Sequence, residues 1–142
     1  MPTEHRTLKI ESLMEKGYAQ YLDGRYQDAE QTYKKGILAI EEESLFQHSM
    51  TARLFFLLGE LYFETSDIAQ ADIFFRHSLA VLEGLPSQND VDICIVLRSL
   101  SETYRLQKKI RQAAKLSIRA TNLMVNTKSL LEDAFNLPAA KH

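Results

Sequence analysis

Apolar side chains recur at helical spacing through most of this chain. Near its middle, one apolar stripe ends at a short polar break, residues 65–67, and a second stripe follows. The first stripe consists of Leu54, Leu58, Leu61 and Tyr62, and the second of Ile68, Ala71, Phe75, Leu79 and Leu82. Intervals of three and four residues place side chains on one face of an α-helix. The pattern therefore predicts two helices joined by a tight turn, each with an apolar face to bury.

The same pattern occurs three times, with a period of 42 residues. The positions related by this shift are Gly17/Gly59/Ser101, Gly36/Ser78/Ala120, Leu13/Phe55/Leu97, Tyr26/Ile68/Ile110 and Ala29/Ala71/Ala113. Small side chains let helix backbones approach, and large apolar ones fill the space beside them. Polar breaks at residues 23–25 and 107–109 match the break at 65–67. We therefore expect three helix pairs, at about residues 8–43, 45–84 and 87–126.

The end of the chain predicts one more element. Asn126 and Thr127 can end a helix, and an apolar segment follows at about residues 128–137. A stack of helix pairs leaves the apolar face of its terminal pair open, so we expect this segment to form a short capping helix. The first seven residues and residues 137–142 are expected to fray.

Composition favours the same class of fold. The 142 residues include only 5 Gly and 3 Pro, which disfavours the turn-rich sandwiches and barrels of all-β proteins. The length suits one compact domain over residues 1–142. A single cysteine, Cys94, excludes an intramolecular disulfide, and no segment has the pattern of a signal peptide or a membrane span. We expect an all-α protein that lies in the cytoplasm and does not enter a membrane.

The repeated positions resemble the tetratricopeptide repeat, whose signature is L-G-x-x-Y followed by A-x-x-x-F-x-x-A. The second copy matches it with Leu58, Gly59, Tyr62, Ala71, Phe75 and Ser78, the first with Gly17, Ala29, Tyr33 and Gly36, and the third with Leu100, Tyr104, Ala113 and Ala120. The period is longer than the usual 34 or so residues and is similar to that of kinesin light chains. The resemblance implies a right-handed superhelix of three antiparallel helix pairs plus a C-terminal capping helix. It also implies a concave groove, lined by the first helix of each pair, that binds a peptide or helix of another protein.

Alignment with the family assigns a set of residues to this groove: Met14, Tyr18, Tyr21, Arg53, Phe56, Glu60, Phe63, Arg98, Glu102 and Arg105. The groove would change from aromatic to basic along the chain, which implies a partner segment with apolar and acidic residues. Phe55 and Phe56 are neighbours on a helix, so we expect one to pack and the other to face outward. The Lys/Asn clamp by which some family members hold chaperone carboxylates is absent, its positions being occupied by Met14, Tyr18, Leu57, Ile95 and Ser99.

Charge is divided unevenly along the chain. Residues 1–90 hold 8 basic and 15 acidic side chains, whereas residues 91–128 hold 8 and 2. A basic patch is expected on the outer side of the third pair, formed by Lys108, Arg111, Lys115 and Arg119. It leaves two alternatives to groove binding: head-to-tail association into a homo-oligomer, and binding of nucleic acid or another acidic ligand. No aromatic side chain interleaves with the patch to stack on bases, so a protein partner is favoured over nucleic acid.

The sequence contains no recognisable catalytic set. It has no GxxxxGK[ST], GxSxG, HExxH or GxGxxG motif. The four histidines do not have the i, i+4 spacing that places two imidazoles on one helix face for a metal; they are His5, His48, His77 and His142. We therefore expect a non-catalytic adaptor or scaffold that needs no metal and no cofactor.

Overall fold

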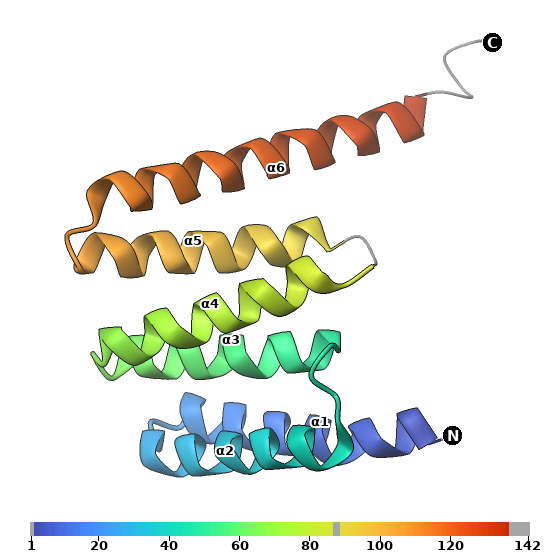
Figure 1. Cartoon of the computed structure of the whole chain (residues 1–142), viewed down its shortest axis with the longest axis vertical. Coiled ribbons are helices and arrows are strands. Elements are labelled where there is room, and N and C mark those ends of the chain that lie inside the picture. The colour runs from blue at the N-terminus through green and yellow to red at the C-terminus, as the bar shows by residue number, and fades with distance from the viewer. Residues whose placement is uncertain (1, 87–88, 137–142) are drawn as a thin grey trace. The chain divides into compact units, whose positions relative to one another are not determined.

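The computed structural model describes residues 2–86 and 89–136, and this part of the chain forms six α-helices (Figure 1). They are α1 (Pro2–Leu22), α2 (Tyr26–Glu43), α3 (Ser49–Glu64), α4 (Ile68–Gly84), α5 (Asp90–Leu106) and α6 (Ile110–Asn136). Every regular element among these described residues is a helix, which confirms the all-α class.

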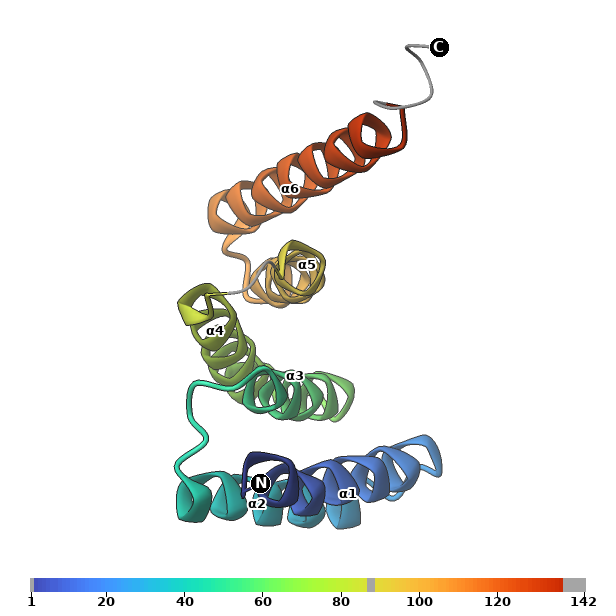
Figure 2. The ribbon, with the colours of Figure 1, turned by 90° about the vertical axis from the view of Figure 1, so that its right-hand side faces the viewer.

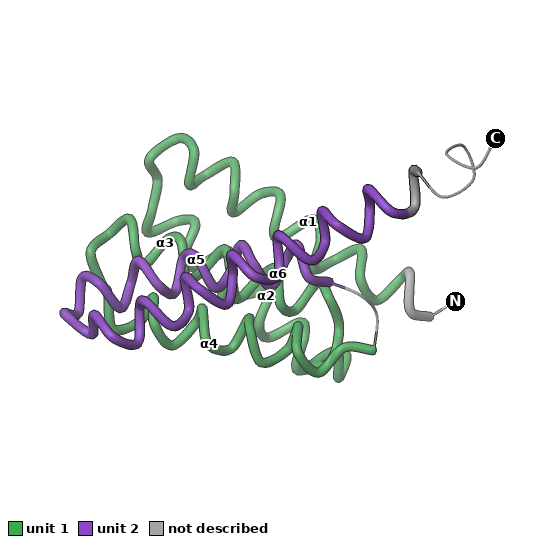
Figure 3. The backbone as a smooth tube through the Cα atoms, turned by 90° about the horizontal axis from the view of Figure 1, so that it is seen from above, with its two compact units in different colours: residues 1–86 green, residues 87–142 purple. Residues whose placement is uncertain are grey.

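The helices form antiparallel pairs: α1 with α2, α3 with α4 and α5 with α6. The chain divides into two compact units, Met1–Pro86 with the first two pairs and Ser87–His142 with the third (Figure 3). In the first unit, α3 packs against α1 and α2 as well as against its own partner α4 (Figure 2). The second unit is a single helical hairpin.

The same turn joins the two helices of each pair. Gly24, Ser66 and Lys108 adopt the left-handed backbone conformation, with φ of 77°, 65° and 62°, and lie 42 residues apart. In each turn the N–H of this residue bonds to the carbonyl three positions back, and the next N–H bonds to the carbonyl five positions back. This arrangement is the Schellman motif, which ends a helix by satisfying its last carbonyls. The three turns confirm the 42-residue period.

The first two pairs close tightly at a glycine. A Cβ atom built on Gly59 would lie 2.5 Å from the ring of Phe75, and Gly17 faces the ring of Tyr33 in the same way. Phe75 and Tyr33 are almost completely buried. Only a residue without a side chain lets each ring lie directly on the opposing backbone.

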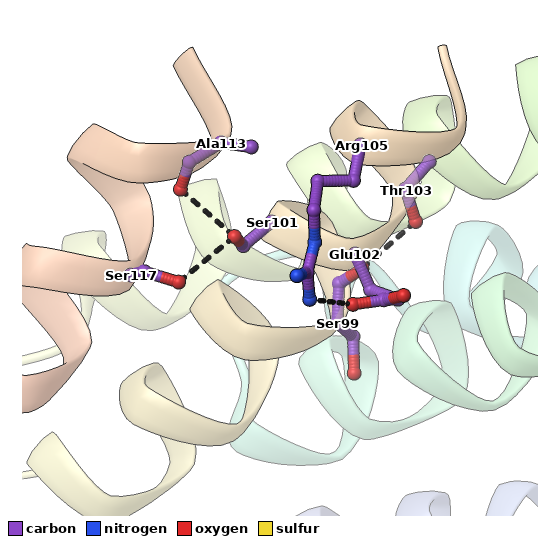
Figure 4. Close-up of polar contacts among 7 residues, drawn as sticks. All are labelled: Ser99, Ser101, Glu102, Thr103, Arg105, Ala113 and Ser117. Atoms are coloured by element: carbon purple, nitrogen blue, oxygen red, sulfur yellow. Dashed lines mark hydrogen bonds and ion pairs between the residues drawn. The ribbon is translucent and has the colours of Figure 1, made fainter. Parts of the chain in front are cut away.

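The third pair solves the same packing problem with two serines. Ser101 occupies the position of the glycines, and Ser117 occupies the position of the two rings. The Ser101 hydroxyl donates a 2.8 Å hydrogen bond to the Ala113 carbonyl and lies 3.0 Å from the Ser117 hydroxyl (Figure 4). Loss of the ring makes room for the serine side chain, and the hydrogen bond satisfies its buried hydroxyl.

Helix α3 buries two opposite faces, because it lies between α4 and the first pair. Leu54 fills the space left by Gly36 of α2, and Leu58 is fully buried beside it on the same stripe. The hydroxyl of Tyr62 donates a hydrogen bond to the Glu30 carboxylate of α2. These contacts join the second pair to the first.

Helix α1 buries only one face, which includes Ile10 and Met14. The residues that lie 42 positions before the buried leucines of α3 are Ser12, Lys16 and Ala19, and all three are exposed. At Ser12 and Lys16 the outer face of α1 is therefore polar where α3 has buried leucines.

The structure differs from expectation at the start of the chain. Helix α1 begins at Pro2, so the prediction of fraying is wrong for residues 2–7, and residue 1 lies outside the described part of the chain. Thr7 is buried, and Arg6 Nε donates a 2.9 Å hydrogen bond to the Glu43 carboxylate at the end of α2. These contacts hold the first turns of α1 against α2.

The expected break near Asn126 is absent. Helix α6 runs without interruption from Ile110 to Asn136, so the segment expected as a separate cap continues this helix, and residues 137–142 lie outside the described part of the chain. No Gly or Pro occurs in this stretch, and the Thr127 hydroxyl bonds to the Leu123 carbonyl within the helix. Leu130 and Leu131 remain exposed, so their side chains do not cover the third pair.

Candidate partner-binding surfaces

Tyrosines line the turn between α1 and α2. The rings of Tyr18 and Tyr21, one turn apart on α1, are stacked with centroids 6.1 Å apart, and Tyr26 at the start of α2 lies 5.6 Å from Tyr21. Tyr18 is 46% exposed, while Tyr21 and Tyr26 are half-buried. Stacked phenols fix a broad, partly apolar surface whose side chains have little freedom left to lose on binding.

Two carboxylates of α3 lie close to these tyrosines. Burial is the main reason that the pKa of Tyr21 is raised, and the charges of Glu64 and Glu60 add to it. Burial also raises the pKa of the Glu60 carboxyl. Among the described residues Glu60 has no ion-pair partner. We call Tyr18, Tyr21, Glu60 and Glu64 the tyrosine–glutamate face.

Other groove residues assigned in the first unit are less available. Met14 is only 6% exposed and belongs to the core, so it cannot serve as a contact residue. Phe56 is half-buried and packs on Phe75 of α4 with ring centroids 5.6 Å apart. Phe55 is half-buried as well, so neither of the two neighbours faces fully outward as expected. Arg53 is exposed and Phe63 is half-buried.

In the second unit the assigned residues lie on α5. Arg98, Glu102 and Arg105 are all exposed, and Arg105 forms an ion pair with Glu102 (Figure 4). An exposed ion pair of this kind contributes little to stability, so both side chains can exchange partners. A groove that runs through all three helix pairs stays a prediction.

The basic patch of the third pair is exposed. Lys108 lies in the turn between α5 and α6, and Arg111, Lys115 and Arg119 follow on α6. The adjacent Lys109 places its ammonium group 5.3 Å from the ring of Tyr104, close enough for a cation–π contact.

Beside the basic patch lies a surface that sequence reasoning missed. We call it the α6 outer stripe, and it consists of Ile110, Ala114, Ile118, Thr121 and Val125. Helical periodicity alone does not separate this stripe from a buried one, since both are apolar. A signal exists in the 42-residue alignment: Ala114 and Ile118 replace residues that are charged in both earlier copies.

The remaining polar candidates have structural roles. His48 caps α3, its Nδ1 accepting a 3.0 Å hydrogen bond from the Met50 N–H. His77 lies against the ring of Phe55. Cys94 is buried, its thiol contacts the Ala120 carbonyl at 3.3 Å, and burial raises the pKa of the thiol.

Within residues 2–86 and 89–136, no cluster of three or more His, Cys, Asp or Glu side chains is placed to hold a metal ion. Within the same ranges, no helix combines the length and the apolar character that crossing a bilayer requires.

The family model described as tetratricopeptide repeat matches residues 8–84. Among solved structures, the crystal structure of BtubC (BKLC) from P. vanneervenii is similar, with a TM-score of 0.80 at 16% sequence identity. The likeness covers 84% of this chain and 48% of that chain, so this chain spans about half the length of BtubC. No curated protein matches the sequence. The solved structure confirms the solenoid fold, and because the family match covers more than half of the sequence, the chain belongs to the tetratricopeptide repeat family.

Proposed function

We propose that this protein is a non-catalytic, cytoplasmic adaptor that holds a peptide or helical segment of another protein. The observation that carries the proposal is the tyrosine–glutamate face, where the exposed Tyr18 ring adjoins a half-buried carboxylate that has no ion-pair partner in the described part of the chain. Large aromatic side chains supply most of the affinity in protein interfaces. A bound segment would cover the Tyr18 ring and bring a hydrogen-bond donor to Glu60.

The charges on α5 define a second requirement on the partner. Arg98 and Arg105 are exposed and can orient an acidic residue. We therefore propose that the partner carries an acidic residue for the arginines of α5 as well as apolar residues for Tyr18 and Phe63. Arg98→Glu should weaken capture of this partner without unfolding the chain.

The experiment is photo-crosslinking in cells of the native host. A photoreactive phenylalanine is placed at Tyr18, and, as a matched control, at Leu38, which is similarly exposed on α2. Proteins crosslinked from position 18, absent from position 38 and lost when Arg98→Glu is added would support the proposal. Identical sets of crosslinked proteins from the two positions would contradict it.

A further inference from the structure

The outer face of α6 carries a solvent-exposed stripe in which four residues are apolar and one is threonine. Ile110, Ile118 and Val125 are 59%, 61% and 60% exposed. They recur at helical spacing together with Ala114 and Thr121, so all five side chains lie on one face of the helix. An exposed apolar side chain on its own is ordinary, but an aligned set marks an interaction surface.

The two earlier helix pairs have an ion pair at the centre of the same surface. In α2, Lys34 pairs with Glu30 at 3.3 Å, and in α4, Arg76 pairs with Asp72 at 2.7 Å. The residues 42 positions further on in α6 are Ala114 and Ile118.

A third position of the stripe is also charged in the two earlier copies and apolar in α6. Glu41 of α2 and Glu83 of α4 correspond to Val125. Three charged positions have thus become apolar in α6 alone, which a merely solvated helix face would not require.

The first unit shows what covers the surface next to these positions on a second helix. Helix α3 packs on α2, and Ile40 of α2 is 1% exposed, whereas the corresponding Met124 of α6 is 41% exposed. The α6 position that corresponds to buried Ile40 is therefore open to solvent, and it lies next to Val125 of the α6 outer stripe. In the first unit a helix covers the neighbouring surface of α2, while the α2 residues that match the stripe at Ile118 and Val125, Lys34 and Glu41, are themselves exposed.

The charge beside the stripe identifies the kind of helix. Arg111, Lys115 and Arg119 each follow a stripe residue by one position and form a parallel basic row. At the first two of these positions both earlier copies have uncharged residues, and α6 contains no acidic residue before Glu132. Such a row attracts acidic side chains and repels basic ones.

We infer that the α6 outer stripe docks an amphipathic helix of a partner protein, with apolar residues on the stripe and acidic residues beside the basic row. The docked helix would run over about 22 Å, the length of the 15 helical steps from Ile110 to Val125. This surface lies on a different helix from the tyrosine–glutamate face, so the inference does not depend on the function proposed above.

A second copy of this chain fits the stripe poorly. The face of α1 that corresponds to the α2-facing side of α3 presents Ser12 and Lys16 instead of leucines, and Lys16 would add positive charge to a basic surface. Two α6 helices packed on each other would bring their basic rows together. Both arrangements lack the apolar and charge complementarity that an acidic amphipathic helix provides.

The test measures binding of three fluorescein-labelled synthetic helices by fluorescence anisotropy. The first has leucines at helical spacing flanked by glutamates, the second has the same leucines flanked by lysines, and the third has the glutamates with alanines in place of the leucines. Only the first should bind. Ile118→Glu and Lys115→Glu should each weaken its binding by at least about tenfold, whereas Leu38→Glu, at a residue of similar exposure on α2, should leave it unchanged.

Circular dichroism melting of each variant distinguishes loss of binding from loss of folding, since all three positions are exposed. Equal binding of the three peptides, or equal weakening by Leu38→Glu, would overturn the inference. A dimer in sedimentation equilibrium that Ile118→Glu dissociates would assign the stripe to a second copy instead. Binding of a short DNA duplex that depends on Lys115 but not on Ile118 would assign the surface to nucleic acid.

Discussion

At the scale of single residues, the distance between the helices of a pair depends on one small residue and the side chain opposite it. In the second pair the small residue is Gly59 and the side chain opposite it is Phe75. In the third pair the partners are Ser101 and Ser117, joined through hydroxyl groups. Glycine with a ring and serine with serine are therefore two solutions to one packing problem, and a change of one partner alone should be costly.

Gly59→Ala should lower the free energy of unfolding by about 1–3 kcal/mol, as overpacking of a core typically does. The new methyl group would lie 2.5 Å from the buried ring of Phe75, which must move. Gly84→Ala is the control, because its methyl group would meet only the Gln47 side chain, at 3.0 Å, and should leave stability unchanged or slightly raised. Urea denaturation compares them. Equal losses for the two variants would show that the contact with Phe75 does not limit the packing.

Glu60 should make the stability of the fold depend on pH. Burial raises the pKa of this carboxyl in the folded state, so the folded chain holds the proton more tightly than the unfolded chain does. The associated stability is present below the unfolded pKa of about 4.3 and is lost as pH rises through the folded pKa. Glu60→Gln removes this loss and should therefore raise stability at pH 7 more than at pH 4.

The measurement is urea denaturation at both pH values, with Glu64→Gln as the control because Glu64 is exposed on the next turn of α3. A gain for Glu60→Gln at pH 7 that is absent for Glu64→Gln is the expected result. The same gain at pH 4 and pH 7 would show that the carboxylate charge is not the cause.

At the scale of elements, the first helix of each pair ends at the same repeat position with a residue in the left-handed conformation. Only the first copy has glycine at this position. Ser66 and Lys108 adopt φ of 65° and 62°, a conformation that costs an L-residue roughly 1–2 kcal/mol and glycine much less. Two of the three turns therefore contain strain that a single substitution can remove.

Ser66→Gly should raise the free energy of unfolding by about 0.5–1 kcal/mol, after allowance for the greater freedom of glycine in the unfolded chain. Ser99→Gly, inside α5, should instead lower it by roughly 0.5 kcal/mol because glycine is a poor helix former. Thermal melting monitored by circular dichroism gives both values. A destabilising effect at Ser66 would mean that the serine side chain stabilises the turn by a contact that outweighs the strain.

Periodicity predicted the helix pairs and their turns well, because each turn is set locally by residues within one helical turn of it. It failed at Asn126, where no Gly or Pro stops the helix and nothing in the sequence forces α6 to end. Family alignment failed at Met14, which it assigned to the groove although the side chain is buried. Whether a residue beside a packed stripe is buried depends on the neighbouring helix, and periodicity within one helix does not contain that information.

At the scale of the whole molecule, the two outer surfaces of the repeat series are unequal. The outer face of α1 is polar, with Ser12 and Lys16 where α3 has buried leucines, whereas the α6 outer stripe is apolar. A solenoid remains a separate molecule only if at least one of its two ends resists stacking. The polar face of α1 provides this resistance, and it predicts a monomer despite the opposite charges of the two halves of the chain.

Replacing that polar face should therefore create end-to-end association. The double variant Ser12→Leu, Lys16→Leu gives α1 the two leucines that α3 packs toward α2. Burial of each leucine contributes about 2 kcal/mol of free energy. The α6 outer stripe of another copy can receive them. Sedimentation equilibrium should show concentration-dependent oligomers for this variant and a monomer for the native chain. Adding Ile118→Glu should restore the monomer. The control variant carries leucines at Gln31 and Lys35, an exposed pair one turn apart on α2, and should not associate. Oligomers of equal size from both leucine pairs would show that added apolar surface drives assembly, rather than the match between α1 and α6.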